Sequence, residues 1–129
     1  MLVVDASVIA PAIVDAGEDG QRFRDRLRGE TIAGPDLLLI EVMSVVRRHA
    51  NAGSITREQA DAAFEDLVDL PISVFPTAPL LPRVWELRDN VTSYDGCYIA
   101  LAEAVDAPLL TADRRLANAP GARCVIEVL

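Results

Sequence analysis

The sequence predicts an α/β fold in which helices pack against a parallel β-sheet. Short β-branched or apolar runs, each long enough for one strand, alternate with segments whose apolar residues recur at helical spacing. The chain has 129 residues, and 51% of them are hydrophobic. That length suits one domain, and that composition supplies one well-filled interior. We therefore expect a single domain over residues 1–129.

The first half of the chain is expected to contain two strands and four helices. Leu2–Val4 is a short β-branched run ending at Asp5, which is typical of a buried parallel strand. Gly34-Pro35 closes the next strand, and Asp36 is placed to cap the helix that follows. The remaining segments are a strand at Thr31–Ala33 and helices at Val8–Ala16, at Gln21–Leu27 (after a Gly-Glu-Asp-Gly break), at Leu37–Asn51, and from Ser54 or Thr56 through Val68.

The second half continues the alternation with shorter elements. Alternating strands and helices form βαβ units, so the sheet is expected to be parallel. A proline-rich turn separates the first strand of this half from the helix after it. The expected segments are strands at Ile72–Phe75, Leu109–Thr111 and Cys124–Ile126, and helices around Val84–Asn90, at Ser93–Val105 and near Arg114–Ala117.

The charge of the chain argues against a simple DNA-binding module. The net charge is −8, from 12 basic and 20 acidic side chains, and every basic residue is arginine. Neutralisation of phosphates supplies most non-specific affinity for nucleic acids, so an acidic protein binds them poorly. An acidic metal site is compatible with this charge, because bound cations reverse the local field. A basic protein partner would also suit it.

Location and redox chemistry are expected to be those of the cytoplasm. No apolar run approaches the ~18–20 residues needed to cross a bilayer, and the opening Met-Leu-Val-Val-Asp lacks the basic flank of a secretion signal. Cys97 and Cys124 lack the spacing of a zinc site or a disulfide framework. His49 is the only histidine, so histidine-based sites are not expected.

Two carboxylates are expected at the carboxyl ends of strands, where open α/β sheets bind ligands. Asp5 ends the first strand, and Asp113 lies two residues after the strand Leu109–Thr111. Each has a hydroxyl two residues away, Ser7 and Thr111 respectively. Residues two apart in extended chain point the same way, so each carboxylate and hydroxyl can face one site. Either aspartate might instead serve only as a helix cap or turn residue.

Glu41 and Asp95 are the other candidate site residues. Glu41 lies in a helix that is apolar on nearly every side and is therefore expected to be buried. A buried carboxylate needs a partner, which would be a metal ion or, alternatively, Arg48, two turns further on along the same helix face. Asp95 falls in the first turn of a helix capped by Thr92 or Ser93. There the helix dipole alone could account for an acidic residue.

Four carboxylates around one small space would repel each other unless a cation neutralised them. A site of acids and hydroxyls without histidine or cysteine favours Mg²⁺ or Mn²⁺ over Zn²⁺. We therefore predict that Asp5, Glu41, Asp95 and Asp113 form a divalent-metal site.

These residues, in this order, resemble the PIN-domain ribonucleases, specifically the toxin subunits of VapBC-type toxin–antitoxin pairs. The resemblance extends over nearly the whole chain. The segments that carry it are Val3-Val4-Asp5-Ala6-Ser7, Glu41 with Arg47-Arg48, Ser93-Tyr94-Asp95-Gly96-Cys97-Tyr98 and its helix, and Leu110-Thr111-Ala112-Asp113-Arg114-Arg115. It departs from the family at position 44, where Ser stands in place of a frequent Asn, and Gly96 loosens the helix start after Asp95.

The resemblance implies a three-layer α/β/α sandwich with a central, mainly parallel sheet of four to five strands. It implies an Mg²⁺-dependent endoribonuclease, with metal held by Asp5, Glu41, Asp95 and Asp113 and supported by Ser7 and Thr111. It also implies a cognate VapB-type antitoxin and a homodimer, for whose surface Trp85 is a candidate residue. The arginines proposed to hold RNA phosphates are Arg47, Arg48, Arg114 and Arg115.

Two other classes of protein share part of this pattern. A haloacid-dehalogenase-type phosphotransferase or a response-regulator receiver also begins with an Asp after the first strand. Both need a later lysine, and this chain has none. A catalytically inactive PIN-like scaffold that only binds a protein partner stays open, and metal-dependent RNA cleavage would separate it from the enzyme.

Overall fold

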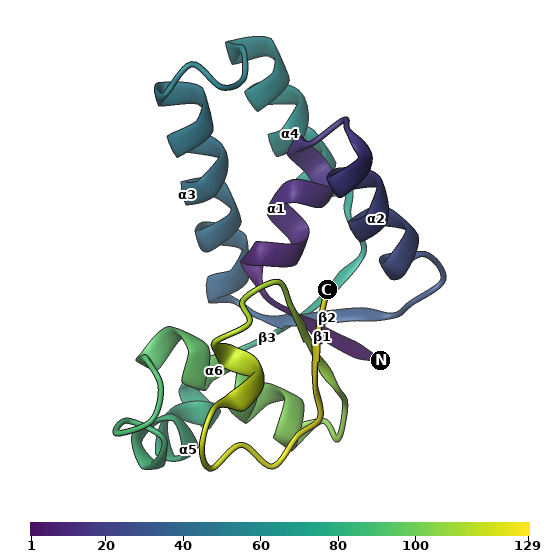
Figure 1. Cartoon of the computed structure of the whole chain (residues 1–129). Coiled ribbons are helices and arrows are strands. Elements are labelled where there is room, and N and C mark those ends of the chain that lie inside the picture. Colours follow the sequence, from purple (N-terminus) through teal and green to yellow (C-terminus); the bar gives the residue numbers. More distant parts are fainter.

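The computed structural model describes all 129 residues and has a five-stranded parallel sheet between two layers of helices. Helices α1 to α4 lie on one side of the sheet, and α5 and α6 lie on the other (Figure 1). The predicted three-layer fold is thus confirmed. The strands are β1 (Leu2–Val4), β2 (Ile32–Pro35), β3 (Ile72–Phe75), β4 (Leu109–Thr111) and β5 (Ile126–Val128). The helices are α1 (Ala6–Val14), α2 (Glu18–Leu27), α3 (Leu37–Asn51), α4 (Arg57–Asp69), α5 (Leu81–Glu86) and α6 (Ser93–Ala104), with single 3₁₀ turns at Ala78–Leu80 and Leu116–Asn118.

The strand order β3-β2-β1-β4-β5 places β1 at the centre of the sheet. All four strand pairs are parallel, and Val3 is aligned with Ala33 of β2 on one side and with Leu109 of β4 on the other. The carboxyl ends of β1 and β4 are therefore neighbours at one edge. This arrangement brings residues 5 and 111–113 together although more than one hundred positions of sequence separate them.

The core is formed where the central strands meet helices from both layers. All three residues of β1 and all three of β4 are buried. Val8 and Ile9 of α1 cover one face of these strands, and Ile99 and Leu101 of α6 cover the other, each at most 1% exposed. Hydrophobic burial of these side chains stabilises the sheet edge that carries the candidate site.

Helix α2 begins three residues earlier than predicted, inside the supposed Gly-Glu-Asp-Gly break. Glu18 and Asp19 stand in its first turn, where acidic side chains complement the helix dipole. Gly20 is buried against the end of α1, and a Cβ there would lie 1.9 Å from the backbone oxygen of Asp15. The glycine therefore allows close helix packing at this point; it does not interrupt the helix.

Three predicted boundaries in the second half of the chain are also wrong. Helix α5 starts at Leu81 because Pro82 occupies a first-turn position that lacks a hydrogen-bonded N–H, so the proline opens the helix. The helix expected near residue 114 is a 3₁₀ turn from Leu116. Strand β5 lies two residues later than predicted, because its register is set by pairing of Ile126 with Leu109 of β4. The bounds of a strand depend on the strand it pairs with, and a short apolar run in the sequence does not identify that partner.

Helix α3 has the predicted bounds, but the expectation that it is buried all round is wrong. Ile40 is 65% exposed and Met43 is 44% exposed, so one apolar face of α3 is open to solvent. Asp36 precedes the helix as expected but makes no side-chain capping bond. None of the helices has both the length and the apolar composition that crossing a bilayer requires.

Candidate active site

Asp5 lies at the carboxyl end of the central strand and is only 6% exposed. Its carboxylate accepts a hydrogen bond from the backbone N–H of Ser7 at 3.1 Å, and this bond caps α1. The hydroxyls of Ser7 and Thr111 also donate to it, one to each oxygen. Burial raises the pKa of Asp5, and these hydrogen bonds offset part of the effect. Asp5 is thus both a helix cap and a buried acceptor at the ligand-binding edge of the sheet.

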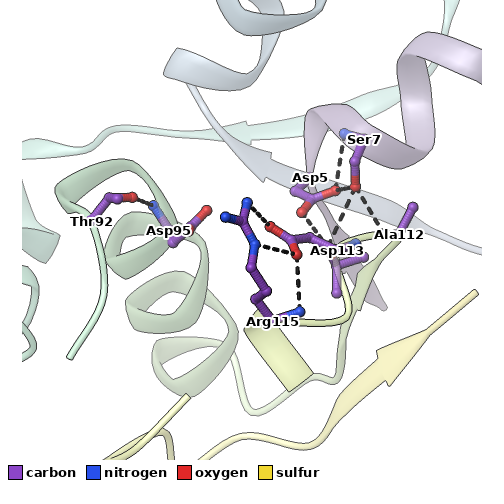
Figure 2. Close-up of polar contacts among 8 residues, drawn as sticks. Asp5, Ser7, Thr92, Asp95, Ala112, Asp113 and Arg115 are labelled. Atoms are coloured by element: carbon purple, nitrogen blue, oxygen red, sulfur yellow. Dashed lines mark hydrogen bonds and ion pairs between the residues drawn. The ribbon is translucent and has the colours of Figure 1, made fainter. Parts of the chain in front are cut away.

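The two hydroxyls connect the ends of β1 and β4 into one network (Figure 2). While donating to Asp5, Ser7 Oγ accepts from the backbone N–H of Ala112 at 2.9 Å, and Thr111 Oγ1 accepts from that of Asp113 at 3.0 Å. Because each hydroxyl has only one proton, accepting from the backbone directs that proton toward Asp5. The network therefore orients an ionised carboxylate, with Ser7 and Thr111 beside Asp5 where the sequence places them.

Asp113 stands at the turn after β4 and is paired with Arg115. The backbone N–H of Arg115 donates to Asp113 Oδ1 at 2.9 Å, and its guanidinium group donates to both carboxylate oxygens at 3.2 and 3.1 Å. These bonds hold the pKa of Asp113 below its usual value. The guanidinium group lies between Asp113 and Asp95 (Figure 2). Arg115 is thus an internal counter-ion for this part of the site.

Asp95 occupies the first turn of α6, on the opposite side of the sheet from α1. Thr92 caps the helix by accepting from the backbone N–H of Asp95 at 3.2 Å, so the Asp95 carboxylate itself is free of the capping role. Burial raises the pKa of Asp95, and the negative charge of Asp113 adds to the rise. The Thr92 hydroxyl offsets part of this rise, and the cap of α6 does not depend on the Asp95 carboxylate.

Glu41 lies on α3 and is the acid of the site that lacks a hydrogen bond to one of its buried oxygens. Its Oε1 and the Tyr98 hydroxyl are both buried, and neither makes a hydrogen bond of good geometry, although they lie close enough for the hydroxyl to lower the pKa of Glu41 slightly. Burial, with the charges of Asp5 and Asp95, raises the pKa of Glu41 to about 7. No ion pair joins Glu41 to Arg48, so that alternative explanation of Glu41 is wrong. An unpaired carboxylate at this depth is a costly feature that a bound cation would relieve.

The donor chemistry of the four carboxylates fits a hard divalent cation. All donors are oxygen atoms, and the pKa values of Asp5, Glu41 and Asp95 are each raised in part by another acid of the set. As the side chains stand, no three His, Cys, Asp or Glu residues converge closely enough to hold one ion together. Binding would therefore require rotation of side chains, including release of Asp113 from Arg115.

Two hollows of similar size flank these carboxylates. The Glu41 hollow, of about 520 Å³, lies between α3 and the start of α6. Its lining includes Ile40, Glu41, Ser44, Arg47, Arg48 and Tyr94. The Asp113 hollow, of about 510 Å³, lies between the loop after α5 and the turn after β4. Its lining includes Arg88, Asn90, Thr92, Asp95, Asp113 and Arg115.

The hollows separate the four arginines that the sequence singled out. Arg47 and Arg48 line the Glu41 hollow and Arg115 lines the Asp113 hollow, whereas Arg114 lines neither. Sequence reasoning missed Arg88, which carries no motif and reaches the site only through the fold. It also gave no role to Tyr98, which it named only as part of the segment around Asp95. The spacing of Tyr98 three residues after Asp95 was the available signal that its hydroxyl faces the same site.

Comparison with known proteins identifies the family to which this arrangement belongs. The family model described as "PIN domain" matches residues 2–122. The chain belongs to the PIN-domain family. Among curated relatives, Ribonuclease VapC1 of Mycobacterium tuberculosis is 41% identical over 128 residues, which cover 98% of this chain and 96% of the relative. This PIN domain is therefore of the VapC group.

Solved structures agree on the fold. VapC20 of Mycobacterium tuberculosis, described as a sarcin–ricin-loop-cleaving toxin, has a TM-score of 0.71 at 14% identity, covering 91% of this chain and 93% of that one. VapBC2 from Rickettsia felis, solved on a fragment of its promoter DNA, has a TM-score of 0.70 at 18% identity, covering 98% and 97%. At these identities the likeness establishes a shared PIN fold.

Removing Arg115 from the PIN-domain site is expected to strengthen metal binding. Arg115 would compete with a cation bound at Asp113, and its side chain is 92% exposed, so the ion pair contributes little to stability. We expect Arg115→Ala to bind Mn²⁺ about two- to five-fold more tightly by isothermal titration calorimetry. Arg114→Ala removes the same charge one residue away and should have a smaller effect. Equal Mn²⁺ affinities in the two variants would show that Arg115 does not compete with the cation for the Asp113 carboxylate.

Proposed function

We propose that this PIN-domain protein is a metal-dependent endoribonuclease that hydrolyses phosphodiester bonds in RNA. The observation that carries the proposal is the set of acidic side chains at the carboxyl edge of the sheet, where Asp5 is oriented by two hydroxyls and Glu41 Oε1 has no partner. The relatives named as VapC ribonucleases support the same activity. Mg²⁺ is the proposed cofactor, with Mn²⁺ as a substitute, because every donor is oxygen.

In the proposed reaction the acidic residues hold a cation and accept a proton. A divalent cation bound there would lower the pKa of an attacking water and polarise the scissile phosphoryl group. Asp5 and Asp95 would hold the cation, with Ser7 and Thr111 keeping Asp5 in position. Glu41 would lie beside the cation and could accept the proton of the attacking water.

We further propose that the protein is the toxin of a toxin–antitoxin pair in the cytoplasm, inhibited by a VapB-type antitoxin. Support comes from the solved VapBC assembly with the same fold and from the open apolar faces of α3 and α4. Ile40, Met43, Phe64 and Val68 are all at least 44% exposed there, an arrangement that suits an amphipathic partner helix. A homodimer is also proposed, with support from Trp85, whose side chain is 68% exposed on the other helical layer.

A second candidate function is a PIN scaffold that binds a protein partner without cutting RNA. The observation that favours it is that no three acidic side chains converge on one point as they stand. Metal dependence separates the two functions, because a scaffold has no need of a cation.

Removal of metal is expected to abolish cleavage. The purified chain, free of any partner, would be incubated with total cellular RNA in Mg²⁺ or Mn²⁺ and in EDTA, and cleaved 5′ ends would be mapped by sequencing. Discrete cuts with 5′-phosphate ends that appear only with metal are expected, because the carboxylates need a cation to approach a phosphate. Cuts that persist in EDTA would contradict the proposal. Folded protein that binds Mn²⁺ but cuts nothing would favour the scaffold.

A further inference from the structure

The Tyr98 hydroxyl is a buried polar group to which the proposed reaction gives no role. Its side chain is 1% exposed and is one of the largest fully buried side chains of the protein. The hydroxyl makes no hydrogen bond of good geometry. A buried donor without a partner lowers stability, and native proteins keep few of them. Phenylalanine would fill the same space without this cost, so the hydroxyl needs an explanation other than packing.

Tyr98 reaches from one helical layer toward an acid of the other layer. It lies on α6, one turn after Asp95, and α6 packs against β1 and β2. Glu41 lies early in α3, which follows directly from β2 on the opposite side of the sheet (Figure 1). The Tyr98 hydroxyl and the Glu41 carboxylate nevertheless lie close enough to interact. This contact therefore joins the two helical layers at the carboxyl edge of the sheet, where the candidate site lies.

The Tyr98 hydroxyl faces negative charge and keeps its proton. Burial raises the pKa of Tyr98, and the charges of Glu41 and Asp5 raise it further. A protonated phenol has one hydrogen bond to donate, and an ionised carboxylate is a strong acceptor for it. Tyr98 is therefore a donor with an acidic acceptor within reach.

Each of the other three acids of the site already has a side-chain partner. The pairs are Ser7 and Thr111 on Asp5, Arg115 on Asp113, and Thr92 beside Asp95. Glu41 takes part in no ion pair, and Tyr98 is the side chain whose hydrogen-bonding group lowers its pKa. Tyr98 thus occupies, next to Glu41, the place that the hydroxyl donors occupy next to Asp5.

We propose that Tyr98 is a positioning residue for Glu41, whose hydroxyl donates to the buried oxygen Oε1. The Glu41 carboxylate also borders the Glu41 hollow, so this bond would leave its second oxygen for a cation or for the proton of the attacking water. Rotation of the Glu41 side chain, as metal binding requires of the site, would align the two groups. This role rests on the proposed ribonuclease function and adds to it a residue that acts through Glu41 without touching RNA.

Mn²⁺ binding by Tyr98→Phe, measured from the electron paramagnetic resonance signal of free Mn²⁺, tests this role. We expect the variant to raise the Kd for Mn²⁺ about ten-fold, because groups that orient a metal ligand typically affect affinity by this factor or more. In a Glu41→Gln background the same change should alter Kd by less than about two-fold, since the hydroxyl acts through Glu41. Tyr94→Phe, which removes a hydroxyl from a side chain that is 65% exposed, is the matched control.

Two further measurements separate positioning from a structural role. Metal-free Tyr98→Phe should unfold at the same urea concentration as the parent chain or at a higher one, because the lost hydroxyl has no partner of good geometry. Metal affinity should therefore fall without a fall in stability. The chain has two tyrosines, so absorption assigns the new bond directly. The tyrosine difference spectrum produced by Mg²⁺ should persist in Tyr94→Phe and disappear in Tyr98→Phe.

The outcomes distinguish the positioning role from the enzyme. Unchanged Mn²⁺ affinity in Tyr98→Phe, together with metal-dependent cleavage by the parent chain, would overturn the role and leave the ribonuclease standing. An equal loss of affinity in the Glu41→Gln background, or a metal-free Tyr98→Phe that is less stable than the parent, would also overturn it. A loss that depends on Glu41, in a chain that cuts no RNA, would support the role and remove the proposed activity. A parent chain that binds no Mn²⁺ would overturn both.

Discussion

Asp95→Asn is expected to lower kcat/KM for RNA cleavage by at least ~100-fold while leaving the chain folded. The cap of α6 does not depend on the Asp95 carboxylate, because Thr92 caps the helix by accepting from the Asp95 backbone N–H at 3.2 Å. The substitution therefore removes one anionic donor from the candidate metal site and keeps the side-chain shape. It also removes a charge that raises the pKa values of Asp5 and Glu41, so the fold should not be weakened.

The matched control for this variant is Asp61→Asn. Asp61 is exposed on α4 and lines neither of the two hollows at the site. Cleavage by the control should stay within about two-fold of the parent chain, as for a surface substitution away from the chemistry. Steady-state cleavage of a labelled RNA, with Mn²⁺ affinity measured by calorimetry on the same samples, provides both readouts. Cleavage by Asp95→Asn at the rate of the parent chain would contradict a role for Asp95 in the active site.

The metal-free protein is expected to lose stability between about pH 5 and about pH 7, and Glu41 should cause most of the loss. The pKa of Glu41 is raised from 4.5 to about 7 by burial and by Asp5 and Asp95. In this window the folded state keeps the proton and the unfolded state releases it, so the free energy of unfolding falls as pH rises. With allowance for the partial exposure of Glu41, the fall should be about 1–2 kcal/mol. Above pH 7 the contribution of Glu41 levels off.

Urea unfolding in EDTA across this pH range, on the parent chain and on Glu41→Gln, measures the effect. The variant should lack most of the fall and be more stable than the parent at neutral pH, yet cleave RNA poorly. Groups with lowered pKa values, such as Asp113 and Glu103, contribute at lower pH and do not obscure this window. Glu65→Gln, on the exposed face of α4, should behave as the parent chain does. A parent chain whose stability rises across the window would contradict the assignment.

A gain in stability in Glu41→Gln would show that the metal-free protein loses free energy of unfolding by keeping this acid at the site. Glu41 and the Tyr98 hydroxyl are the two buried polar groups without partners in this chain. Their cost is tolerated at the carboxyl edge of the sheet, where strain and unmet hydrogen bonds tend to accompany function. Added Mg²⁺ should accordingly stabilise the parent chain more at neutral pH than at about pH 5.

Much of the fold could be predicted from the sequence, because local patterns determine it. The β-branched run before Asp5, the apolar spacing of α3 and the capping residues of α4 and α6 each act within a few positions of sequence. The order of the elements then leads to a parallel sheet, since strands joined by helices pair in parallel. The same logic placed Asp5 and Asp113 at one edge before any contact was known.

Sequence alone thus determined the fold class, the single domain and the residue types of the site. Tertiary structure decided how those residues are partnered: Ser7 and Thr111 on Asp5, Arg115 on Asp113, and nothing on Glu41 Oε1. It also decided that α3 keeps an open face, and that Arg88 reaches the site while Arg114 does not. The physical reason is that helices and strands follow from neighbours in the chain. Burial, pairing and the charge around a carboxylate depend on segments that only folding brings together.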